Sequence, residues 1–245
     1  MVDEYRIKEM ICDIGKRIYN RKMVAANDGN ISVKISDNEF LCTPTGISKG
    51  VMTPECICKV DAQGNVIEAN GGFRPSSEIK MHMRVYNKRP DVGAVVHAHP
   101  VFATTFAVMG IPLTQPIMSE AVVSLGCVPL APYGTLSTME VPDSIEPYIE
   151  YFDALLLESH GAVTWDKDLE SAYMKMESVE FYAELMYRVK MLGEPRVFNQ
   201  ERIEKLYEVR KKIGIPERHP IDLCKKRTLE ICQKCGGRFH EDNEK

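Results

Sequence analysis

Two short apolar segments that end in histidine constrain the fold of this chain more than any other feature. A buried strand stopped by proline is predicted for residues 93–100 (GAVVHAHP), and the alternation of side chains along a strand places His97 and His99 on one face. A second apolar strand is predicted for residues 154–161 (ALLLESHG), and it ends at His160. If the two strands are neighbours in one sheet, the three imidazoles face one point.

Three histidines are the ligand set of an open catalytic zinc site, which leaves a coordination position for water or substrate. Glu78 is the candidate for a fourth, exchangeable ligand or for a general base beside the metal. A single histidine on an apolar strand is more often a hydrogen-bonded core residue. The prediction of a metal site therefore depends on His97, His99 and His160 taken together.

The rest of the chain alternates helical patterns with short strands. Helices are predicted over residues 3–21, 79–88, 101–109 and 169–192, and another begins at 143. Strands are predicted over 31–35, 41–43 and 129–133, with a hairpin in 59–68. Ser76 or Ser77 is the expected N-cap of the helix at 79–88.

Charge and composition exclude several classes of protein. The 31 Lys and Arg against 35 Asp and Glu give a net charge of −4, which repels a nucleic-acid backbone, so no nucleic-acid partner is expected. No segment approaches the roughly 18 apolar residues of a membrane span, and residues 1–20 are too charged for a secretory signal. We therefore expect a cytoplasmic protein without membrane contact, whose 8 cysteines are mostly reduced.

Three small polar turns are candidate phosphate-binding elements: residues 27–30, residues 43–46, and Ser76-Ser77 at a helix start. Backbone N–H groups, hydroxyls and a helix N-terminus are what a phosphate monoester requires. Each turn is weak evidence alone, because most such turns only reverse the chain. Neither a dinucleotide fingerprint nor a Walker loop is present.

The joint pattern is far more specific than its parts. It consists of Gly29-Asn30 with Ser32, Thr43-Pro44-Thr45-Gly46, Ser76-Ser77-Glu78, His97-Ala98-His99-Pro100 and His160-Gly161. In this order and spacing, over roughly residues 5–192, the chain resembles the class II aldolase superfamily of fuculose-phosphate aldolases, ribulose-phosphate 4-epimerases and adducin heads. The resemblance implies an α/β fold, a three-layer α/β/α sandwich around a mixed, mostly antiparallel sheet. It also implies a homotetramer with sites between subunits.

The resemblance further implies one Zn²⁺ per subunit on His97, His99 and His160, with Glu78 as an exchangeable neighbour and acid/base. The residues expected to hold the substrate phosphate are Gly29, Asn30, Thr45, Gly46, Ser76 and Ser77. The implied activity is reversible cleavage of a ketose 1-phosphate to dihydroxyacetone phosphate and an aldehyde. Candidate substrates are L-fuculose 1-phosphate and a related 5-deoxy pentulose 1-phosphate.

The chain departs from the aldolases of this family at one position. They carry a tyrosine in the segment corresponding to residues 116–126, and this chain has none. Glu120 can replace it as an acid, although an exposed carboxylate at a helix start is an equally good interpretation. A methylthioribulose-1-phosphate dehydratase and a pentulose-phosphate 4-epimerase are the alternatives. The epimerases have Asp after the two serines, so Glu78 favours aldol cleavage.

The predicted domains are a catalytic domain at residues 1–214 and a cysteine-containing C-terminal tail at 215–245. Cys224, Cys232, Cys235 and His240 form a series that suggests a second zinc site. The first gap in this series is long for a compact zinc site, so a tail without metal is favoured. The non-enzyme alternative is an adducin-like scaffold, against which the three histidines and Glu78 argue.

Overall fold

The computed structural model describes residues 3–215. Within this range eight strands form one sheet, in the order β4-β3-β2-β1-β5-β8-β7-β6. All neighbouring strands are antiparallel except the parallel pair β6 and β7, so the predicted mixed, mostly antiparallel sheet is confirmed. The strands are β1 (Asn30–Lys34), β2 (Phe40–Cys42), β3 (Cys58–Val60), β4 (Val66–Glu68), β5 (Ala94–Ala98), β6 (Leu130–Ala131), β7 (Ala154–Leu157) and β8 (Gly161–Asp166).

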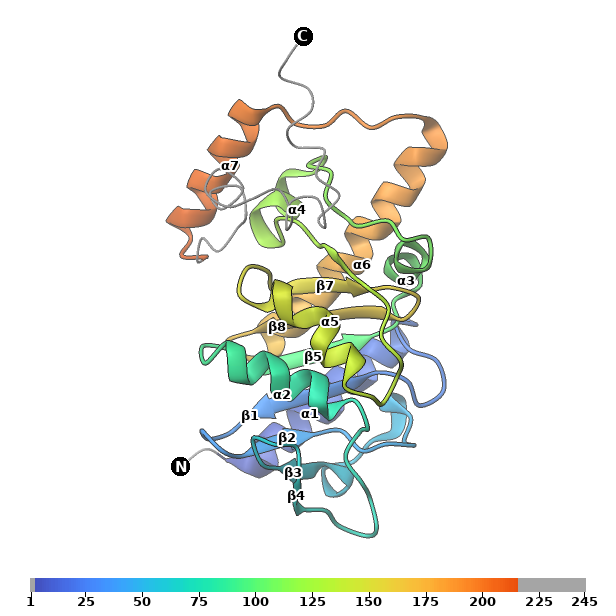
Figure 1. The fold of residues 1–245 in the computed structure, drawn as a ribbon, viewed down its shortest axis with the longest axis vertical. Helices are drawn as coiled ribbons and strands as arrows, with labels where there is room; N and C mark the ends of the chain where they lie inside the picture. The colour runs from blue at the N-terminus through green and yellow to red at the C-terminus, as the bar shows by residue number, and fades with distance from the viewer. Residues whose placement is uncertain (1–2, 216–245) are drawn as a thin grey trace.

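Helices cover both faces of the sheet, which confirms the three-layer α/β/α arrangement (Figure 1). The α-helices are α1 (Glu4–Asn20), α2 (Ile79–Lys88), α3 (Val101–Val108), α4 (Ser119–Ser124), α5 (Glu140–Ile149), α6 (Leu169–Leu192) and α7 (Gln200–Lys212). Two 3₁₀ turns, η1 (Lys49–Val51) and η2 (Pro54–Cys56), follow β2. The layer of α2 and α5 lies on one face, and α1, α3 and α6 lie on the other.

Side-chain alternation along the central strands sorts residues between two apolar clusters. On β5, Ala94 and Val96 pack with α1 and α6, whereas Val95 packs with α2 and α5. His97 has the parity of Val95 and therefore lies on the α2 face of the sheet. The N-terminus of α2 is thus on the same side of the sheet as this histidine.

The structure corrects the prediction for His160. The strand predicted over 154–161 stops at Leu157, and Glu158, Ser159 and His160 form a turn in which Ser159 has a φ of 56°. A separate strand, β8, begins at Gly161, because apolar residues resume after the polar turn. The sequence analysis did not predict this strand. β8, not β7, is the neighbour of β5.

Other differences are local. The N-cap of α2 is Glu78 rather than Ser76 or Ser77, and the Ser76 hydroxyl accepts a hydrogen bond from the Glu78 amide at 3.3 Å. β6 has only two residues, and the sequence analysis did not predict α4 or α7. The helices predicted over 3–21, 79–88, 101–109 and 169–192 are confirmed within one or two residues at each end.

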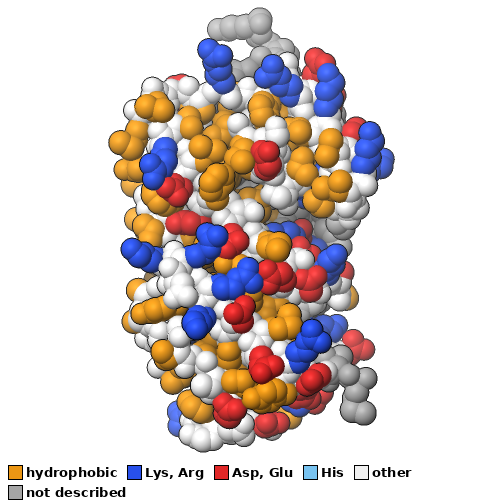
Figure 2. Space-filling model, turned by 180° about the vertical axis from the view of Figure 1, so that it is seen from behind, with side chains coloured by type: hydrophobic (Ala, Val, Ile, Leu, Met, Phe, Trp, Pro, Cys, Tyr) orange, Lys and Arg blue, Asp and Glu red, His pale blue; other side chains and the backbone are white. Residues whose placement is uncertain are grey.

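Figure 2 shows the face opposite to that of Figure 1, with hydrophobic side chains gathered over its upper half and charges of both signs mixed across its middle. Exposed apolar residues of α3 and α6 include Val101, Val108, Met174, Phe181 and Met191. Because positive and negative charges alternate, this face lacks the single-sign field that attracts a polyanion.

Among residues 3–215, no helix is both long and apolar enough to cross a membrane. The five cysteines of this range form no disulfide with one another. Cys224, Cys232, Cys235 and His240 lie outside the described residues, so the second zinc site and the domain boundary at 214 stay predictions.

Candidate metal centre

Three histidine side chains converge where two adjacent strands meet. His97 is on β5, His99 follows this strand by one residue, and His160 directly precedes β8. Ala98 pairs with Ala162 in the antiparallel register, which brings these ends of β5 and β8 together. One nitrogen of each ring lies within 4.8 Å of the other two, and the Nε2 atoms of His97 and His99 are 3.2 Å apart.

The hydrogen bond of the His97 ring orients the lone pair of its other nitrogen toward the cluster. Nδ1 of His97 lies 2.9 Å from the carbonyl oxygen of Ala162 and must donate its proton there, which leaves the Nε2 lone pair facing His99. A tetrahedral zinc ion with Zn–N bonds of 2.0–2.1 Å holds its ligand nitrogens about 3.3 Å apart. The cluster is therefore consistent with a divalent metal site.

The electrostatics of the rings suit metal binding as well. Burial, reinforced by the neighbouring His97, lowers the pKa of His99 to about 4 and that of His160 to about 3. Both imidazoles are therefore neutral at pH 7, the form in which histidine binds a metal. Asp28, which sequence reasoning did not single out, lies with Oδ2 3.4 Å from Nδ1 of His99, on the ring edge away from His97.

Glu78 faces the cluster from the N-terminus of α2. Its Oε2 is 3.4 Å from Nε2 of His97, and its Oε1 is 3.4 Å from Nε2 of His160. Burial raises the pKa of Glu78, but His97, His160 and the amide of Asn30 outweigh that effect and hold it well below its usual range. Oε1 is buried without a hydrogen-bond donor among the described residues, as expected for an oxygen that faces a cation.

The position of Glu78 is set by contacts between α2 and β1. Asn30 donates from Nδ2 to Oε2 of Glu78 at 2.9 Å. Ser32 follows Asn30 on β1 by two residues. Its hydroxyl lies 2.7 Å from Nδ1 of His82 and 2.9 Å from the hydroxyl of Tyr86. Glu78, His82 and Tyr86 are four residues apart, so one stripe of α2 meets alternate residues of β1.

Two of the predicted phosphate turns are paired with each other. The amide of Thr45 donates to the carbonyl of Arg74 at 2.8 Å, and the amide of Ser76 donates to the carbonyl of Thr43 at 3.1 Å. Thr45, Gly46 and Ser77 are exposed there. Ser76 in turn contacts Glu78, so this pair of turns adjoins the histidine cluster.

The third turn lies against the end of β5. Asn30 is the register partner of His97, and Gly29 has a φ of 74°. A Cβ on Gly29 would lie 2.9 Å from the carbonyl oxygen of His97, so only glycine fits. Gly29 and Asn30 therefore lie beside His97, and Ser76 contacts Glu78, whereas Thr45, Gly46 and Ser77 are exposed in the adjoining turns. The phosphate-binding roles of all six residues stay predictions.

Gly161 permits the approach of His160 to His99, and its replacement is expected to impair metal binding. A Cβ there would lie 2.6 Å from the carbonyl oxygen of Ala98 and 2.7 Å from Cδ2 of His99. We expect Gly161→Ala to weaken zinc affinity by about 10–100-fold, the cost typical of a disturbed outer shell. Competition with a chelating indicator measures this affinity.

Gly93→Ala is the matched control, because its Cβ would lie 2.1 Å from the carbonyl oxygen of Lys167 beyond the other end of the same strand pair. Both variants should unfold at lower temperature, and only Gly161→Ala should lose zinc affinity. An equal loss of zinc affinity in the two variants contradicts a specific role for Gly161.

Glu120 is not brought to this cluster. It lies exposed in the first turn of α4, which packs on α6 and α7, and within residues 3–215 its carboxylate makes no hydrogen bond or ion pair. The sequence analysis predicted an acid here, and this prediction is not tested by the contacts within one chain.

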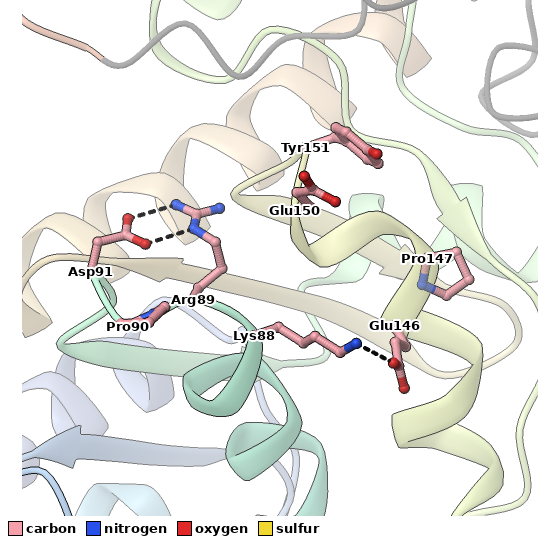
Figure 3. Close-up of a pocket in the computed structure, with 8 residues that line it drawn as sticks. All are labelled: Lys88, Arg89, Pro90, Asp91, Glu146, Pro147, Glu150 and Tyr151. Atoms are coloured by element: carbon pink, nitrogen blue, oxygen red, sulfur yellow. Dashed lines mark hydrogen bonds and ion pairs between the residues drawn. The ribbon is translucent and has the colours of Figure 1, made fainter. Parts of the chain in front are cut away.

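A cavity of about 520 Å³ lies at the other end of α2 (Figure 3). Its charged groups are largely paired with one another: Lys88 with Glu146 at 2.6 Å, and Arg89 with Asp91 at 2.9 Å. Glu78 at one end of α2 and Lys88 at the other are separated by ten residues, or about 15 Å of helix. This cavity is therefore separate from the histidine cluster.

Comparison with known protein families identifies the fold. Residues 9–187 match the family described as Class II Aldolase and Adducin N-terminal domain. The chain belongs to this family. Membership confirms the resemblance predicted from the motifs, and the three-histidine cluster is consistent with a divalent metal site typical of class II aldolases.

Individual relatives differ in their activity. The chain is 35% identical to an L-fuculose phosphate aldolase of Methanococcus maripaludis over 71% of this chain and 92% of that protein. It is 30% identical to a 5-deoxy-D-ribulose 1-phosphate aldolase of Bacillus thuringiensis, over 81% of this chain and 92% of that protein. It is 29% identical to a 3-oxo-tetronate 4-phosphate decarboxylase of Haemophilus influenzae, over 75% of this chain and 88% of that protein. A solved L-fuculose 1-phosphate aldolase superimposes with a TM-score of 0.77 at 31% identity, covering 84% of this chain and 96% of that chain.

Proposed function

We propose that this protein is a zinc-dependent aldolase that reversibly cleaves a ketose 1-phosphate to dihydroxyacetone phosphate and an aldehyde. The observation that carries the proposal is the position of the buried Glu78 carboxylate, which faces both His97 and His160 beside the paired turns at 43–46 and 74–77. The substrate carbon that exchanges a proton can face Glu78 while the substrate phosphate lies at the paired turns. The similarity to fuculose-phosphate and deoxyribulose-phosphate aldolases supports this choice of substrate class.

His97, His99 and His160 would hold one Zn²⁺, with Glu78 as the exchangeable neighbour. Bound there, the ion supplies a Lewis acid for the C2 carbonyl and for the negative charge that develops on it. We assign binding of the substrate phosphate to Gly29, Asn30, Thr45, Gly46, Ser76 and Ser77.

Glu78 is the proposed acid/base. In cleavage the acid/base group that serves the C4 oxygen takes the proton of the C4 hydroxyl, the C3–C4 bond breaks, and its electrons form the enediolate of dihydroxyacetone phosphate while the aldehyde leaves. Glu78 takes a proton from solvent and delivers it to C3, and in synthesis the carboxylate removes this proton and returns it to solvent. The hydrogen bond from Asn30 holds Oε2 in place, and the side chain of Glu78 is only 15% exposed, which limits the access of water to it.

We assign the acid that serves the C4 oxygen to Glu120 of an adjoining copy, because the proposed homotetramer has its sites between subunits. The measurement that tests the assembly is the mass in solution, expected at four times 27.7 kDa. A monomer mass contradicts both the tetramer and this role of Glu120.

A decarboxylase is the second candidate, favoured by the relative from Haemophilus influenzae. Loss of CO₂ from a 3-oxo-tetronate 4-phosphate leaves electrons on the carbon next to the ketone, and therefore yields the same enediolate of dihydroxyacetone phosphate. The two reactions differ only in the group that leaves, an aldehyde or CO₂. The histidine cluster and Glu78 serve both.

The test is a panel of substrates offered to the zinc-loaded protein: L-fuculose 1-phosphate, 5-deoxy-D-ribulose 1-phosphate and 3-oxo-tetronate 4-phosphate. We expect dihydroxyacetone phosphate together with an aldehyde from at least one ketose 1-phosphate. Release of CO₂ from the third compound alone makes the protein a decarboxylase. Loss of water without release of triose phosphate would assign the protein as a dehydratase, and inversion at C4 without triose phosphate would assign it as an epimerase. If none of the compounds reacts, the adducin-like scaffold is favoured.

A further inference from the structure

Lys49 is a lysine of unusual burial beside the site. It lies on η1, is 2% exposed, and donates from Nζ to the carbonyl oxygen of Asn27 at 2.8 Å and to that of Ile47 at 3.0 Å. Fully buried lysines are rare, because removing an ammonium group from water costs free energy that only hydrogen bonds or opposite charge can offset. Backbone carbonyl groups provide that compensation here.

The two carbonyl groups lie in or next to two different turns to which we assign the substrate phosphate, residues 27–30 and residues 43–46. Asn27 lies two residues before Gly29, and Ile47 directly follows Gly46. One ammonium group therefore ties the turn before β1 to the turn after β2. These are two of the three turns to which we assign the substrate phosphate.

The backbone of Lys49 is itself held firmly. A Cβ on Gly15 of α1 would lie 3.0 Å from the carbonyl oxygen of Lys49 and 3.6 Å from its Cβ, so α1 packs directly on η1. Ser48 caps η1 by accepting from the amide of Gly50 at 3.4 Å. Burial lowers the pKa of Lys49 to about 8, while the charges of Asp28 and Cys56 act in the opposite direction.

We propose that Lys49 is a positioning residue for the substrate phosphate, which fixes the two turns relative to each other and places a positive charge behind them. The inference rests on the proposed function. It also explains how a chain with a net charge of −4 offers a favourable potential to a phosphate monoester at this edge. The side chain acts through the turns and does not itself touch the substrate.

The test compares Lys49→Met with Lys59→Met by calorimetric titration of zinc-loaded protein with dihydroxyacetone phosphate. Lys59 on β3 is the matched control, because its side chain is also largely buried. Its ammonium group pairs with Glu4 of α1 at 2.8 Å and not with the carbonyl groups of the two turns. We expect Lys49→Met to bind dihydroxyacetone phosphate about 10–100-fold more weakly, the effect of losing hydrogen bonds from a charged group. Zinc affinity should stay within about twofold, because the histidines are untouched, and Lys59→Met should change neither affinity.

Lys49→Gln, which keeps N–H donors but no charge, should recover part of the lost affinity. Unchanged binding in a folded Lys49→Met variant overturns the proposal, as does an equal loss of dihydroxyacetone phosphate and zinc affinity. If neither variant folds, hydrogen exchange in the wild-type protein decides: the turns at 27–30 and 43–46 must gain protection together when dihydroxyacetone phosphate binds. Failure of the wild-type protein to bind this ligand is a different result and contradicts the proposed function instead.

Discussion

Replacement of Glu78 by glutamine is expected to lower kcat by about 10²–10⁴-fold while the metal stays bound, because general acid/base catalysis by a positioned side chain contributes that much. Glutamine has the shape of glutamate and can still accept the hydrogen bond that Asn30 donates to Oε2. It cannot take or give the C3 proton. The measurement is the rate of dihydroxyacetone phosphate release, together with the zinc content of the same sample.

Glu170→Gln is the control for Glu78→Gln, because Glu170 pairs with Arg17 on α1 and lies outside the site. It should keep the rate within about twofold, since exposed ion pairs contribute little to stability and this one does not contact the cluster. A Glu78→Gln variant with an undiminished rate contradicts the role of Glu78. A rate that falls only in proportion to lost zinc makes Glu78 a ligand rather than a base.

Replacement of His97 by alanine is expected to remove both the metal and the activity. His97 is 0% exposed, and its Nε2 faces His99, so no other side chain can take its place. Loss of a direct ligand should cost more than the 10–100-fold in affinity that an outer-shell change costs. Elemental analysis of the purified variant should therefore find zinc far below one ion per chain.

His82→Ala is the matched control for His97→Ala. His82 is also 0% exposed, and burial lowers its pKa to about 3, but its partner is the hydroxyl of Ser32 rather than a second imidazole. Both variants leave a cavity and should unfold at lower temperature. Retention of zinc by His97→Ala, or equal loss from the two variants, excludes His97 as a ligand.

Periodicity predicted much of this site. His97 and His99 are two residues apart on a strand, so their shared face follows from alternation alone. His160 was placed at the site for the wrong reason, since the prediction ran one strand through residues 158–160 and missed β8. The physical cause is the polar turn Glu158-Ser159-His160, which a short apolar pattern does not distinguish from a strand end.

Contacts that depend on tertiary structure could not be predicted. The pairing of the turn at 43–46 with Arg74 and Ser76 joins residues that are 29 and 33 positions apart in the chain, and nothing local specifies it. Lys49 in a polar loop has the pattern of a solvated side chain, and it is buried by tertiary contacts with α1 and with the turns that contain Asn27 and Ile47. The family resemblance supplied the phosphate residues, which spacing alone had left as ordinary turns.

The central claim is that Glu78, beside a metal on three histidines, moves a proton on the enediolate of dihydroxyacetone phosphate. Its most direct test needs no aldehyde: the zinc-loaded protein is mixed with dihydroxyacetone phosphate in D₂O, and exchange at the hydroxymethyl carbon is followed by NMR. The account predicts that the wild-type protein exchanges one of the two hydrogens, and that chelation of the metal or Glu78→Gln stops it. Hydrogen exchange that continues after chelation of the metal or in the Glu78→Gln variant would contradict the account. So would a lack of exchange in wild-type protein that binds both zinc and dihydroxyacetone phosphate.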